Sequence, residues 1–446
     1  MTSLSSQPYK GTRDYYPEDK RVQNYIFDTW RHVVERHGYE EYGAPLLEPL
    51  DLYAAKSGQE LAGEQTYAFE DRGGRTVAIR PEMTPSISRM VAARRQELAY
   101  PARLYSIANF MRYERPQRGR EREFWQLNLD LFGVDNVRAD AEIIQVAYET
   151  LKEFGASDDM FEVKINHRAL INHIMSDYLN LDAVQSHLMI KLLDRKNKMS
   201  PESFKEQAIE IFGEDNMSTD LPKIADLLSV KSIKDLPRAL ADSEVLSEVI
   251  ELFNILDKNG VKNAQFDATL MRGLDYYTGM VFEVVDRAPE NNRSMFGGGR
   301  YDGLVGLFGV EPIPTVGVAP GLSPVTLFLE THKLLPQLKT TIDASIVVLG
   351  DAMEGAQKFA NQLRSEGVNV EVDISDRKID KQIKSIVKKQ VPFMIFVGEE
   401  ELKQGLYSLK EVSTAKEEKL SLERIVTRLA DRRNRLPSDE IEGLIG

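Results

Sequence analysis

The chain has 446 residues, of which 42% are hydrophobic and 28% are charged, so it has a globular composition and the length of two or three domains. It contains no cysteine, which excludes disulfides, thiolate metal sites and a cysteine nucleophile. The net charge of −13 argues against a general nucleic-acid-binding domain, although a basic stripe on an acidic protein can still contact RNA.

The first third of the chain predicts an antiparallel sheet with helices packed on it. Residues 17–37 have apolar residues at helical spacing, with Pro17 suited to the first turn and Gly38 to the C-cap. Pro45 and Pro49 suit an edge strand or a bend rather than a central strand. Alternation and turn signals then predict two strand pairs and a helix: 66–71 with 75–80, 103–112 with 123–132, and a helix over 139–154.

The middle of the chain changes from strands to helices and back. Residues 168–260 have helical spacing and few glycines, whereas strand-like segments return at 265–286 and 315–321. The helical block is therefore expected to be an insertion into one β-rich domain, whose two parts span residues 1–167 and 261–330.

The last quarter predicts a separate domain. Apolar strands and amphipathic helices alternate over residues 343–397 in a β-α-β-α-β series, which predicts a parallel sheet within a domain over residues 342–446. Residues 331–341, which include Pro336, form the expected linker.

One helix of this domain, over residues 377–389, is basic and amphipathic. We expect it to carry two stripes, with Lys381, Lys384 and Lys388 toward solvent and Ile379, Ile383 and Ile386 toward the sheet. The lysines suit an RNA backbone, and a solvated lysine-rich face is the alternative.

Neither a membrane segment nor a structural metal site is expected. Residues 1–9 are polar and lack the apolar core of a signal peptide, and no apolar run approaches the roughly 18 residues of a membrane span. The six histidines show no HxxxH or HxxH spacing, so no protein-bound metal is predicted. We therefore expect a cytoplasmic protein without membrane contact.

The most unusual segment is Phe110–Phe124, in which five arginines alternate with glutamates between two predicted strands. A guanidinium group binds phosphate oxygens in bidentate fashion and stays charged at any working pH. A hairpin with arginines at its base and in its loop can hold a nucleoside triphosphate and guide the end of a nucleic acid. A solvated loop with internal ion pairs is the alternative.

Three further segments combine polar groups with strand or turn signals. Leu270–Gly279 lies in an apolar strand context, where Arg272 either faces an anion or pairs with Asp275. Phe296–Gly303 begins with three consecutive glycines after Phe296, which permit close approach of a ligand or only a tight turn. Arg80–Thr84 ends a hairpin strand with a carboxylate and a hydroxyl, suited to an amino group or to a surface role.

Together these segments resemble the class II aminoacyl-tRNA synthetases, and the histidyl-tRNA synthetases in particular. Residues 110–124 look like the second signature motif of the class, whereas RGLDYYTG (272–279) and GGRYDG (298–303) look like two histidine-site motifs. KGTRD (10–14) is similar to the N-terminal start of the family. The resemblance covers nearly the whole chain. It implies an α+β catalytic domain built on an antiparallel sheet with a helical insertion, and a C-terminal α/β anticodon-binding domain.

The resemblance also implies a reaction in two steps. ATP with Mg²⁺ and L-histidine form histidyl-adenylate, and the histidyl group is then transferred to the 3′ end of tRNA(His). By resemblance, Arg112 and Arg272 are catalytic, on either side of the α-phosphate. The histidine contacts are Glu82, Met83, Thr84, Arg112, Gln126, Asp130, Arg272, Tyr276, Tyr277 and Tyr301. The ATP contacts are Arg112, Arg120, Phe124 and Arg272, and the contacts to the tRNA acceptor end are Arg115 and Gln117. A homodimer is implied too, with the first helix and the Pro45 strand at its interface.

Two positions depart from the family pattern. The imidazole-site carboxylate is usually a glutamate, and here Asp130 is one methylene shorter. The third class II motif usually carries an arginine for the γ-phosphate at the place where this chain has Ser323 and Pro324. Either another cation supplies that charge or ATP is bound more weakly.

These departures leave two alternatives to a synthetase. One is a catalytically silent, histidine-binding regulatory subunit, but such proteins usually lack the anticodon domain and the full arginine set. The other is an RNA-binding paralogue that no longer activates an amino acid. Retention of Arg112, Arg120 and Arg272 together with a C-terminal domain favours the enzyme.

Overall fold

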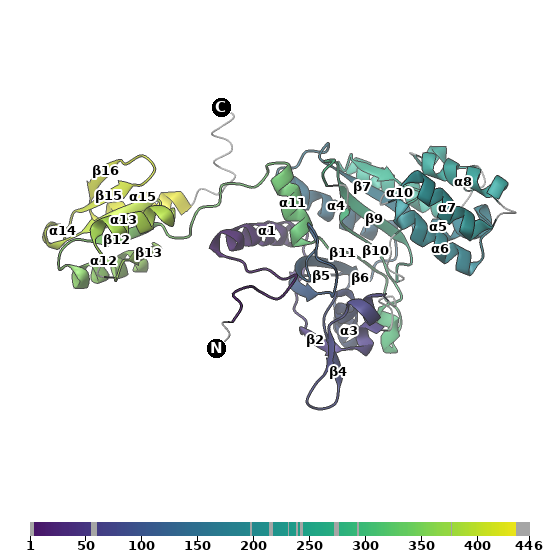
Figure 1. The fold of residues 1–446 in the computed structure, drawn as a ribbon, viewed down its shortest axis with the longest axis horizontal. Coiled ribbons are helices and arrows are strands. Elements are labelled where there is room, and N and C mark those ends of the chain that lie inside the picture. Colours follow the sequence, from purple (N-terminus) through teal and green to yellow (C-terminus); the bar gives the residue numbers. More distant parts are fainter. Residues whose placement is uncertain are drawn as a thin grey trace. The chain divides into compact units, whose positions relative to one another are not determined.

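The computed structural model forms two compact units, Met1–Leu335 and Pro336–Gly446 (Figure 1). The residues that it describes are 4–54, 60–196, 199–213, 217–230, 232–237, 240, 244–271, 276–291, 294–375 and 377–433. Each unit has its own sheet and its own hydrophobic core.

An eight-stranded sheet forms the centre of the first unit, in the order β1-β5-β6-β11-β10-β9-β7-β8. Its strands are β1 (Glu40–Glu41), β5 (Ala102–Met111), β6 (Glu123–Phe132), β7 (Phe161–His167), β8 (Ala264–Phe266), β9 (Met280–Asp286), β10 (Ser294–Arg300) and β11 (Thr315–Val318). Neighbouring strands are antiparallel except at the edges, where β1 pairs with β5 and β8 with β7 in parallel. The predicted antiparallel sheet is confirmed for the central strands, and the parallel edge pairs make the whole sheet mixed.

Helices α1 (Pro17–Arg36), α4 (Val137–Glu153) and α11 (Leu322–Thr331) pack on this sheet and share its core (Figure 1). In α1, Ile26, Trp30 and Val33 recur at helical spacing and are fully buried. Burial of side chains of this size contributes on the order of 2 kcal/mol each to folding. The helix predicted over residues 17–37 is therefore confirmed, and its apolar stripe is the surface that holds it to the sheet.

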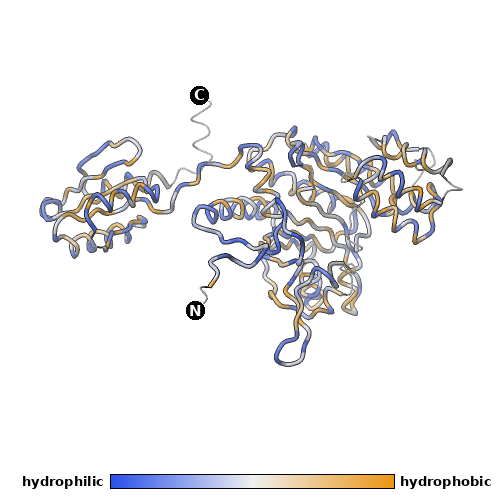
Figure 2. Tube along the Cα trace, viewed as in Figure 1, coloured by the Kyte–Doolittle hydropathy of each residue, from blue (hydrophilic) through white to orange (hydrophobic). Residues whose placement is uncertain are grey.

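A smaller sheet lies beside the large one. It consists of β2 (Leu47–Pro49), β4 (Thr76–Ile79) and β3 (Ala68–Glu70), in the order β2-β4-β3, so Pro49 is on an edge strand as predicted. The predicted hairpin is β3–β4, and the Asp71 carboxylate holds its tip by accepting hydrogen bonds from the backbone of Gly73 (2.8 Å) and Arg75 (3.0 Å). Figure 2 shows this tip as a polar loop. Helix α3 (Thr84–Arg94) follows directly after β4.

The block between β7 and β8 is helical in its described residues. Its α-helices are α5 (Arg168–His173), α6 (Ala183–Asp194), α7 (Pro201–Phe212), α8 (Met217–Ser229) and α10 (Glu244–Lys258). They gather at one side of the first unit in Figure 1, and α10 also packs on α4 and β7. This arrangement agrees with the helical spacing of residues 168–260.

The second unit contains a five-stranded sheet in the order β13-β12-β14-β15-β16. Its strands are β12 (Ala344–Val348), β13 (Val370–Val372), β14 (Phe393–Val397), β15 (Tyr407–Glu411) and β16 (Glu417–Leu420). Its helices are α12 (Met353–Ser365), α13 (Ile379–Lys388), α14 (Glu399–Gln404) and α15 (Leu422–Arg433). The β-α-β-α-β series is confirmed with β12, β13 and β14 parallel. However, β15 and β16 add an antiparallel edge that the sequence reading missed.

Two strands of the first unit differ from the sequence reading. The glycine-rich segment Phe296–Gly303 is largely a strand, β10, rather than a turn, because Gly298 packs against β11 and Gly299 packs against the backbone of β9 and a tyrosine ring. A Cβ at Gly299, for example, would lie 2.9 Å from the ring of Tyr277. The second strand, β7, was not predicted, although apolar and polar residues alternate at the start of its sequence, FEVKINH.

Candidate active site

Strand β6 presents two different faces. Leu127 and Leu129 belong to the core that the helices cover, so the side chains at alternate positions point to the opposite face of the sheet. Phe124, Gln126 and Asp130 occupy those alternate positions. Three predicted site residues therefore share the sheet face that points away from the helices.

Asp130 and Tyr301 form a buried pair on this face. The Tyr301 hydroxyl donates a hydrogen bond to the Asp130 carboxylate, and the two residues are only 3% and 5% exposed, respectively. Burial raises the pKa of Asp130 to about 7, whereas the hydrogen bond from Tyr301 acts to lower it. Gly317 on β11 faces both groups, and a Cβ there would overlap the Asp130 carboxylate and lie 2.7 Å from the Tyr301 hydroxyl oxygen. Only glycine at position 317 leaves this pair in place.

Glu82 joins the same cluster from a distant part of the chain. It follows β4, is 5% exposed, and accepts a hydrogen bond of 3.3 Å from the Tyr276 hydroxyl. The Tyr276 ring packs edge-on against Tyr301, with 5.6 Å between ring centres, and against Tyr277 at 5.1 Å. Two carboxylates and two tyrosine hydroxyls are thus brought together, which suits a small ligand with several N–H groups.

Met83 and Thr84 form the start of α3 beside this cluster. Met83 is the N-cap residue, is 1% exposed and packs with Ala108 and Phe110 of β5. Thr84 is half-buried at the first helical position. Met83 therefore fixes the position of the Glu82 segment on the sheet.

Arg112 lies between the Glu82 segment and Phe124. Its Nε donates a hydrogen bond of 2.9 Å to the Pro81 carbonyl, and its guanidinium carbon is 5.2 Å from the centre of the Phe124 ring. Phe124 also packs against Phe110, with 5.7 Å between ring centres. This arrangement places a cation and an aromatic face next to the carboxylate cluster.

The arginine-rich loop ends in a tight turn. The N–H groups of Gln117 and Arg120 each donate to the carbonyl of the other, at 3.0 and 2.9 Å. Arg115 and Arg120 are exposed, and the Arg120 Nε lies 2.8 Å from a Glu114 carboxylate oxygen. Internal ion pairing thus exists in this loop, but the Arg120 side chain remains 57% exposed and can reach a ligand.

One arginine of the segment proved to be structural. Arg122 is buried, and its guanidinium donates to the Glu114 carbonyl at 3.1 Å and to the Tyr9 hydroxyl at 3.0 Å. Its side chain therefore fastens the loop to the N-terminal segment.

Arg272 and the Arg272–Asp275 pairing alternative lie outside the described residues. On either side of them, residues 267–271 and 276–279 form turns and loops, and the strand β9 begins only at Met280. For the described residues of this segment the expected strand context was therefore wrong: Leu270, Met271, Tyr276 and Tyr277 pack in the core without joining the sheet.

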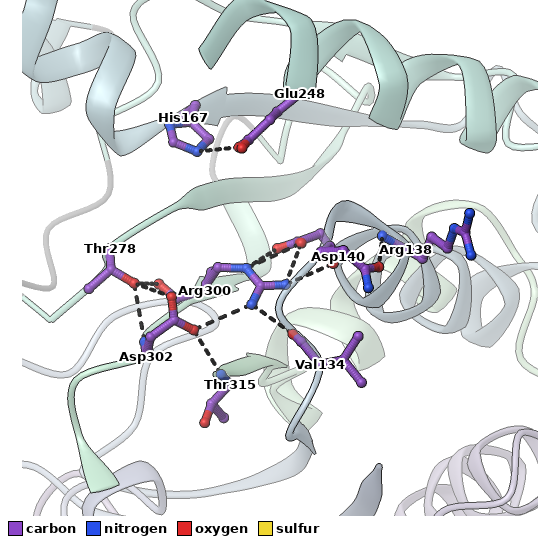
Figure 3. A network of polar contacts seen from close by, with 10 residues as sticks. Val134, Arg138, Asp140, His167, Glu248, Thr278, Arg300, Asp302 and Thr315 are labelled. Atoms are coloured by element: carbon purple, nitrogen blue, oxygen red, sulfur yellow. Dashed lines mark hydrogen bonds and ion pairs between the residues drawn. The ribbon is translucent and has the colours of Figure 1, made fainter. Parts of the chain in front are cut away.

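The sequence reading assigned no role to Arg300 and Asp302, which form a polar network behind the site (Figure 3). The Arg300 guanidinium donates to the Asp140 carboxylate at 2.6 Å and to the Val134 carbonyl at 3.0 Å, and Asp302 accepts from the backbone of Thr315 at 2.9 Å. Neighbouring side chains along a strand point to opposite faces, so Arg300 faces α4 while Tyr301 faces Asp130. The network thus holds the strand end that positions Tyr301.

Ser323 lies at the first turn of α11, where the family pattern has its motif 3. Its hydroxyl donates a hydrogen bond of 3.0 Å to Glu121, at the end of the arginine-rich loop. The loop and α11 also meet at Gly119, where a Cβ would lie 3.7 Å from Leu327. Positions 323 and 324, where the arginine is absent, therefore lie directly beside the arginine-rich loop.

In the second unit, α13 carries the predicted lysine stripe. Lys381, Lys384 and Lys388 are exposed, and Ile386 is 2% exposed. Ile379 is 40% exposed, so its predicted position toward the sheet was wrong. Ile379 is the first residue of α13, and Gln382, one turn later, is buried together with Ile386.

No cluster of three or more potential metal-ligating His, Asp or Glu side chains occurs in the described part of the chain. Among the helices within the described ranges, none is long and apolar enough to cross a membrane.

The chain matches two family profiles. The histidyl-tRNA synthetase profile matches residues 11–325, and an anticodon-binding domain profile matches residues 343–432. Together the two profiles cover both compact units.

Individual relatives agree with these profiles. A histidine–tRNA ligase of Leptospira biflexa is 41% identical over 92% of this chain and 94% of its own length. The crystal structure of a histidyl-tRNA synthetase from Nostoc sp. superposes with a TM-score of 0.80 at 24% identity, covering 96% of this chain and 100% of that one. A Bacillus halodurans structure, described as an ATP phosphoribosyltransferase regulatory subunit/histidyl-tRNA synthetase, gives a TM-score of 0.72 at 25% identity, with 89% and 99% coverage.

The fold, the two profiles and the identity over nearly the full length are consistent with one another. The C-terminal match also disfavours a regulatory subunit that lacks an anticodon domain. The chain therefore belongs to the histidyl-tRNA synthetases, class II aminoacyl-tRNA synthetases with a C-terminal anticodon-binding domain.

Proposed function

We propose that the chain activates L-histidine with ATP and transfers the histidyl group to the 3′ end of tRNA(His). The observation that carries this proposal is the buried chain of contacts from Asp130 through Tyr301 and Tyr276 to Glu82. A carboxylate can accept an imidazole N–H, and a second carboxylate can hold the α-ammonium group. Histidine carries both an imidazole N–H and an α-ammonium group within one small molecule.

In the first step a carboxylate oxygen of histidine attacks the α-phosphorus of ATP and pyrophosphate leaves. Negative charge builds up around the pentavalent phosphorus, and we assign Arg112 to offset it; its contacts with the Pro81 carbonyl and the Phe124 ring, beside the amino-acid cluster, support this role. Arg272 is assigned the opposite side of the α-phosphate, Arg120 the outer phosphates and Phe124 the adenine. In the second step a ribose hydroxyl of the terminal adenosine attacks the histidyl carbonyl, and AMP leaves.

The remaining contacts follow the same assignment. Met83, Thr84, Gln126 and Tyr277 complete the histidine site, and Arg115 and Gln117 face the tRNA acceptor end. Magnesium enters with ATP as part of the substrate, because Mg²⁺ keeps several waters and binds mainly through phosphate oxygens.

The domain roles are also part of the proposal. Residues 1–167 and 261–330 form the catalytic domain, 168–260 the helical insertion, 331–341 the linker and 342–446 the anticodon-binding domain. We further propose a cytoplasmic homodimer that uses α1 and the Pro45 strand as its interface. Exposed apolar residues at Leu46, Leu47 and Phe69, all about half exposed, support an interface on that side.

The test combines an activity with a single-atom change. The purified wild-type protein should catalyse histidine-dependent exchange between ATP and pyrophosphate and should charge tRNA(His). Tyr301→Phe removes only the hydroxyl that holds Asp130, so the KM for histidine should rise roughly 10- to 100-fold while the KM for ATP stays within about twofold.

Tyr148→Phe is the matched control. Tyr148 lies on α4, away from the cluster. It is also buried, and its hydroxyl also donates a hydrogen bond to an aspartate, Asp158, at 2.7 Å. The control should keep the wild-type KM for histidine. Absence of histidine-dependent exchange from well-folded wild-type protein would contradict the proposed function itself.

A further inference from the structure

The first turn of α11 has no cation at the place where the family pattern carries an arginine for the γ-phosphate. The whole helix, Leu322–Thr331, contains neither lysine nor arginine. Instead the Ser323 hydroxyl donates to one oxygen of the Glu121 carboxylate at 3.0 Å. A triphosphate brought to this point therefore needs a positive charge from another part of the chain.

An arginine from the N-terminal segment reaches the same carboxylate. The Nη1 of Arg13 lies 4.0 Å from the other oxygen of Glu121, which is beyond hydrogen-bond length. Among the residues that the structure describes, its one hydrogen bond goes to Asp19, at 2.9 Å from Nη2. The guanidinium carbon is 4.5 Å from the centre of the Tyr15 ring, and 44% of the side chain is exposed. Arg13 thus keeps donors available on the side that faces Glu121.

The backbone before Arg13 is fastened to the base of the arginine-rich loop. The Arg122 N–H donates to the Gly11 carbonyl at 2.7 Å, and the Arg122 guanidinium donates to the Lys10 carbonyl at 3.3 Å. Gly11 has φ +89°, and a Cβ there would lie 2.8 Å from side-chain atoms of both Arg122 and Pro116. Arg13 is therefore held next to the loop, two residues after a close contact.

We propose that Arg13 supplies the positive charge toward the outer phosphates of ATP that positions 323 and 324 lack. This proposal rests on the proposed function, since it concerns the same substrate. A guanidinium fork can leave Asp19 and bind two phosphate oxygens at once. Arg120, the other assigned cation, is paired with a different carboxylate, Glu114, so the two arginines are held by separate acidic groups.

Direct binding of nucleotides tests the proposal without relying on turnover. Calorimetry would measure dissociation constants of ATP with Mg²⁺ and of AMP for the wild-type protein, Arg13→Ala and Arg13→Lys. Arg13→Ala should weaken ATP binding about tenfold and leave AMP binding within about twofold, because AMP has no outer phosphates. Arg13→Lys should fall between the two, since an ammonium group keeps the charge but not the fork.

Arg377→Ala is the matched control, because Arg377 is similarly exposed (45%), pairs with a carboxylate, Asp373 at 2.6 Å, and belongs to the other unit. It should leave both nucleotides at wild-type affinity. Pro324→Arg in the Arg13→Ala background should restore most of the lost ATP affinity. Unchanged ATP affinity in Arg13→Ala, or an equal loss for AMP, would overturn the proposal. Failure of the wild-type protein in histidine-dependent exchange would instead overturn the proposed function, and the ATP-to-AMP comparison would still decide the role of Arg13.

Discussion

At the scale of single residues, the carboxyl group of Asp130 is buried where its ionised form is unfavourable. It is buried on the face of β6 that points away from the helices, with the Tyr301 hydroxyl as its hydrogen-bond donor, and burial raises its pKa to about 7. A raised carboxyl pKa means that the folded protein holds a proton that the unfolded chain has already released. A group that costs stability and lies beside a second buried carboxylate, Glu82, has the character of a ligand-binding group.

Asp130→Asn is therefore expected to stabilise the protein and to abolish its function. The aspartate penalty develops as pH rises from about 4, the ordinary carboxyl pKa, through the folded value of about 7. The variant should gain on the order of 1–3 kcal/mol at pH 8 relative to the wild type, and little at pH 4. Denaturant unfolding at both pH values measures this gain. Equal effects at the two pH values would contradict the assigned cost of ionisation.

The surroundings of Asp130 show how the chain accommodates a side chain that is one methylene shorter than the glutamate of the family pattern. Its carboxylate is already reached by Tyr301, and Gly317 leaves room for both groups. The sequence indicated Asp130, Tyr276 and Tyr301 as neighbours only through the family resemblance. The contact between Glu82 and Tyr276 spans 194 residues, and no local pattern reports a contact of that separation.

At the scale of elements, the end of β10 at Arg300 shows which helices, strands and contacts local sequence patterns predict and which they do not. Period and turn signals predicted α1, β5, β6 and the first three strands of the second unit, because local residues decide those elements. They failed for β10, where the glycines serve tertiary contacts with Tyr277 and with β11 rather than a turn. They also failed for Arg300, whose partners, Asp140 on α4 and Val134 just before that helix, are 160 and 166 residues away.

Arg300→Lys tests whether that strand end positions the site. The guanidinium makes hydrogen bonds to Asp140, Asp302 and the Val134 carbonyl, and a lysine can replace only part of this fan (Figure 3). We expect a loss of about 2–4 kcal/mol of stability, because Asp140 remains buried without its full set of donors. The KM for histidine should rise more than the KM for ATP, since Tyr301 follows directly in the chain.

Arg287→Lys is a suitable comparison for Arg300→Lys. Arg287 has one loose ion pair, 3.6 Å from Glu162, and is 38% exposed. It should change stability by less than about 0.5 kcal/mol. If Arg300→Lys were equally mild, the network would not be what holds the Tyr301 strand end.

At the scale of the whole molecule, the net charge of −13 must be reconciled with an RNA substrate. The proposed tRNA-binding charges are local: arginines of the 110–124 loop in the first unit and the lysine stripe of α13 in the second. An acidic protein with two separate basic areas attracts RNA at those areas and repels RNA from the rest of its surface. The two areas would then make separable contributions to charging.

The triple variant Lys381→Ala, Lys384→Ala and Lys388→Ala should separate those contributions. Loss of up to three phosphate contacts should raise the KM for tRNA(His) about tenfold or more, and should reduce the salt dependence of tRNA binding, whose slope follows the number of contacts. Histidine-dependent ATP–pyrophosphate exchange should remain at the wild-type rate, because α13 belongs to the other unit. The matched control replaces three other exposed lysines of the same unit, Lys358, Lys403 and Lys416. Both triple variants lower the net charge by three, so a loss specific to α13 identifies a binding surface. An equal loss in the two variants would mean that only the overall charge of the unit matters, and the α13 stripe would then be no more than a solvated helix face.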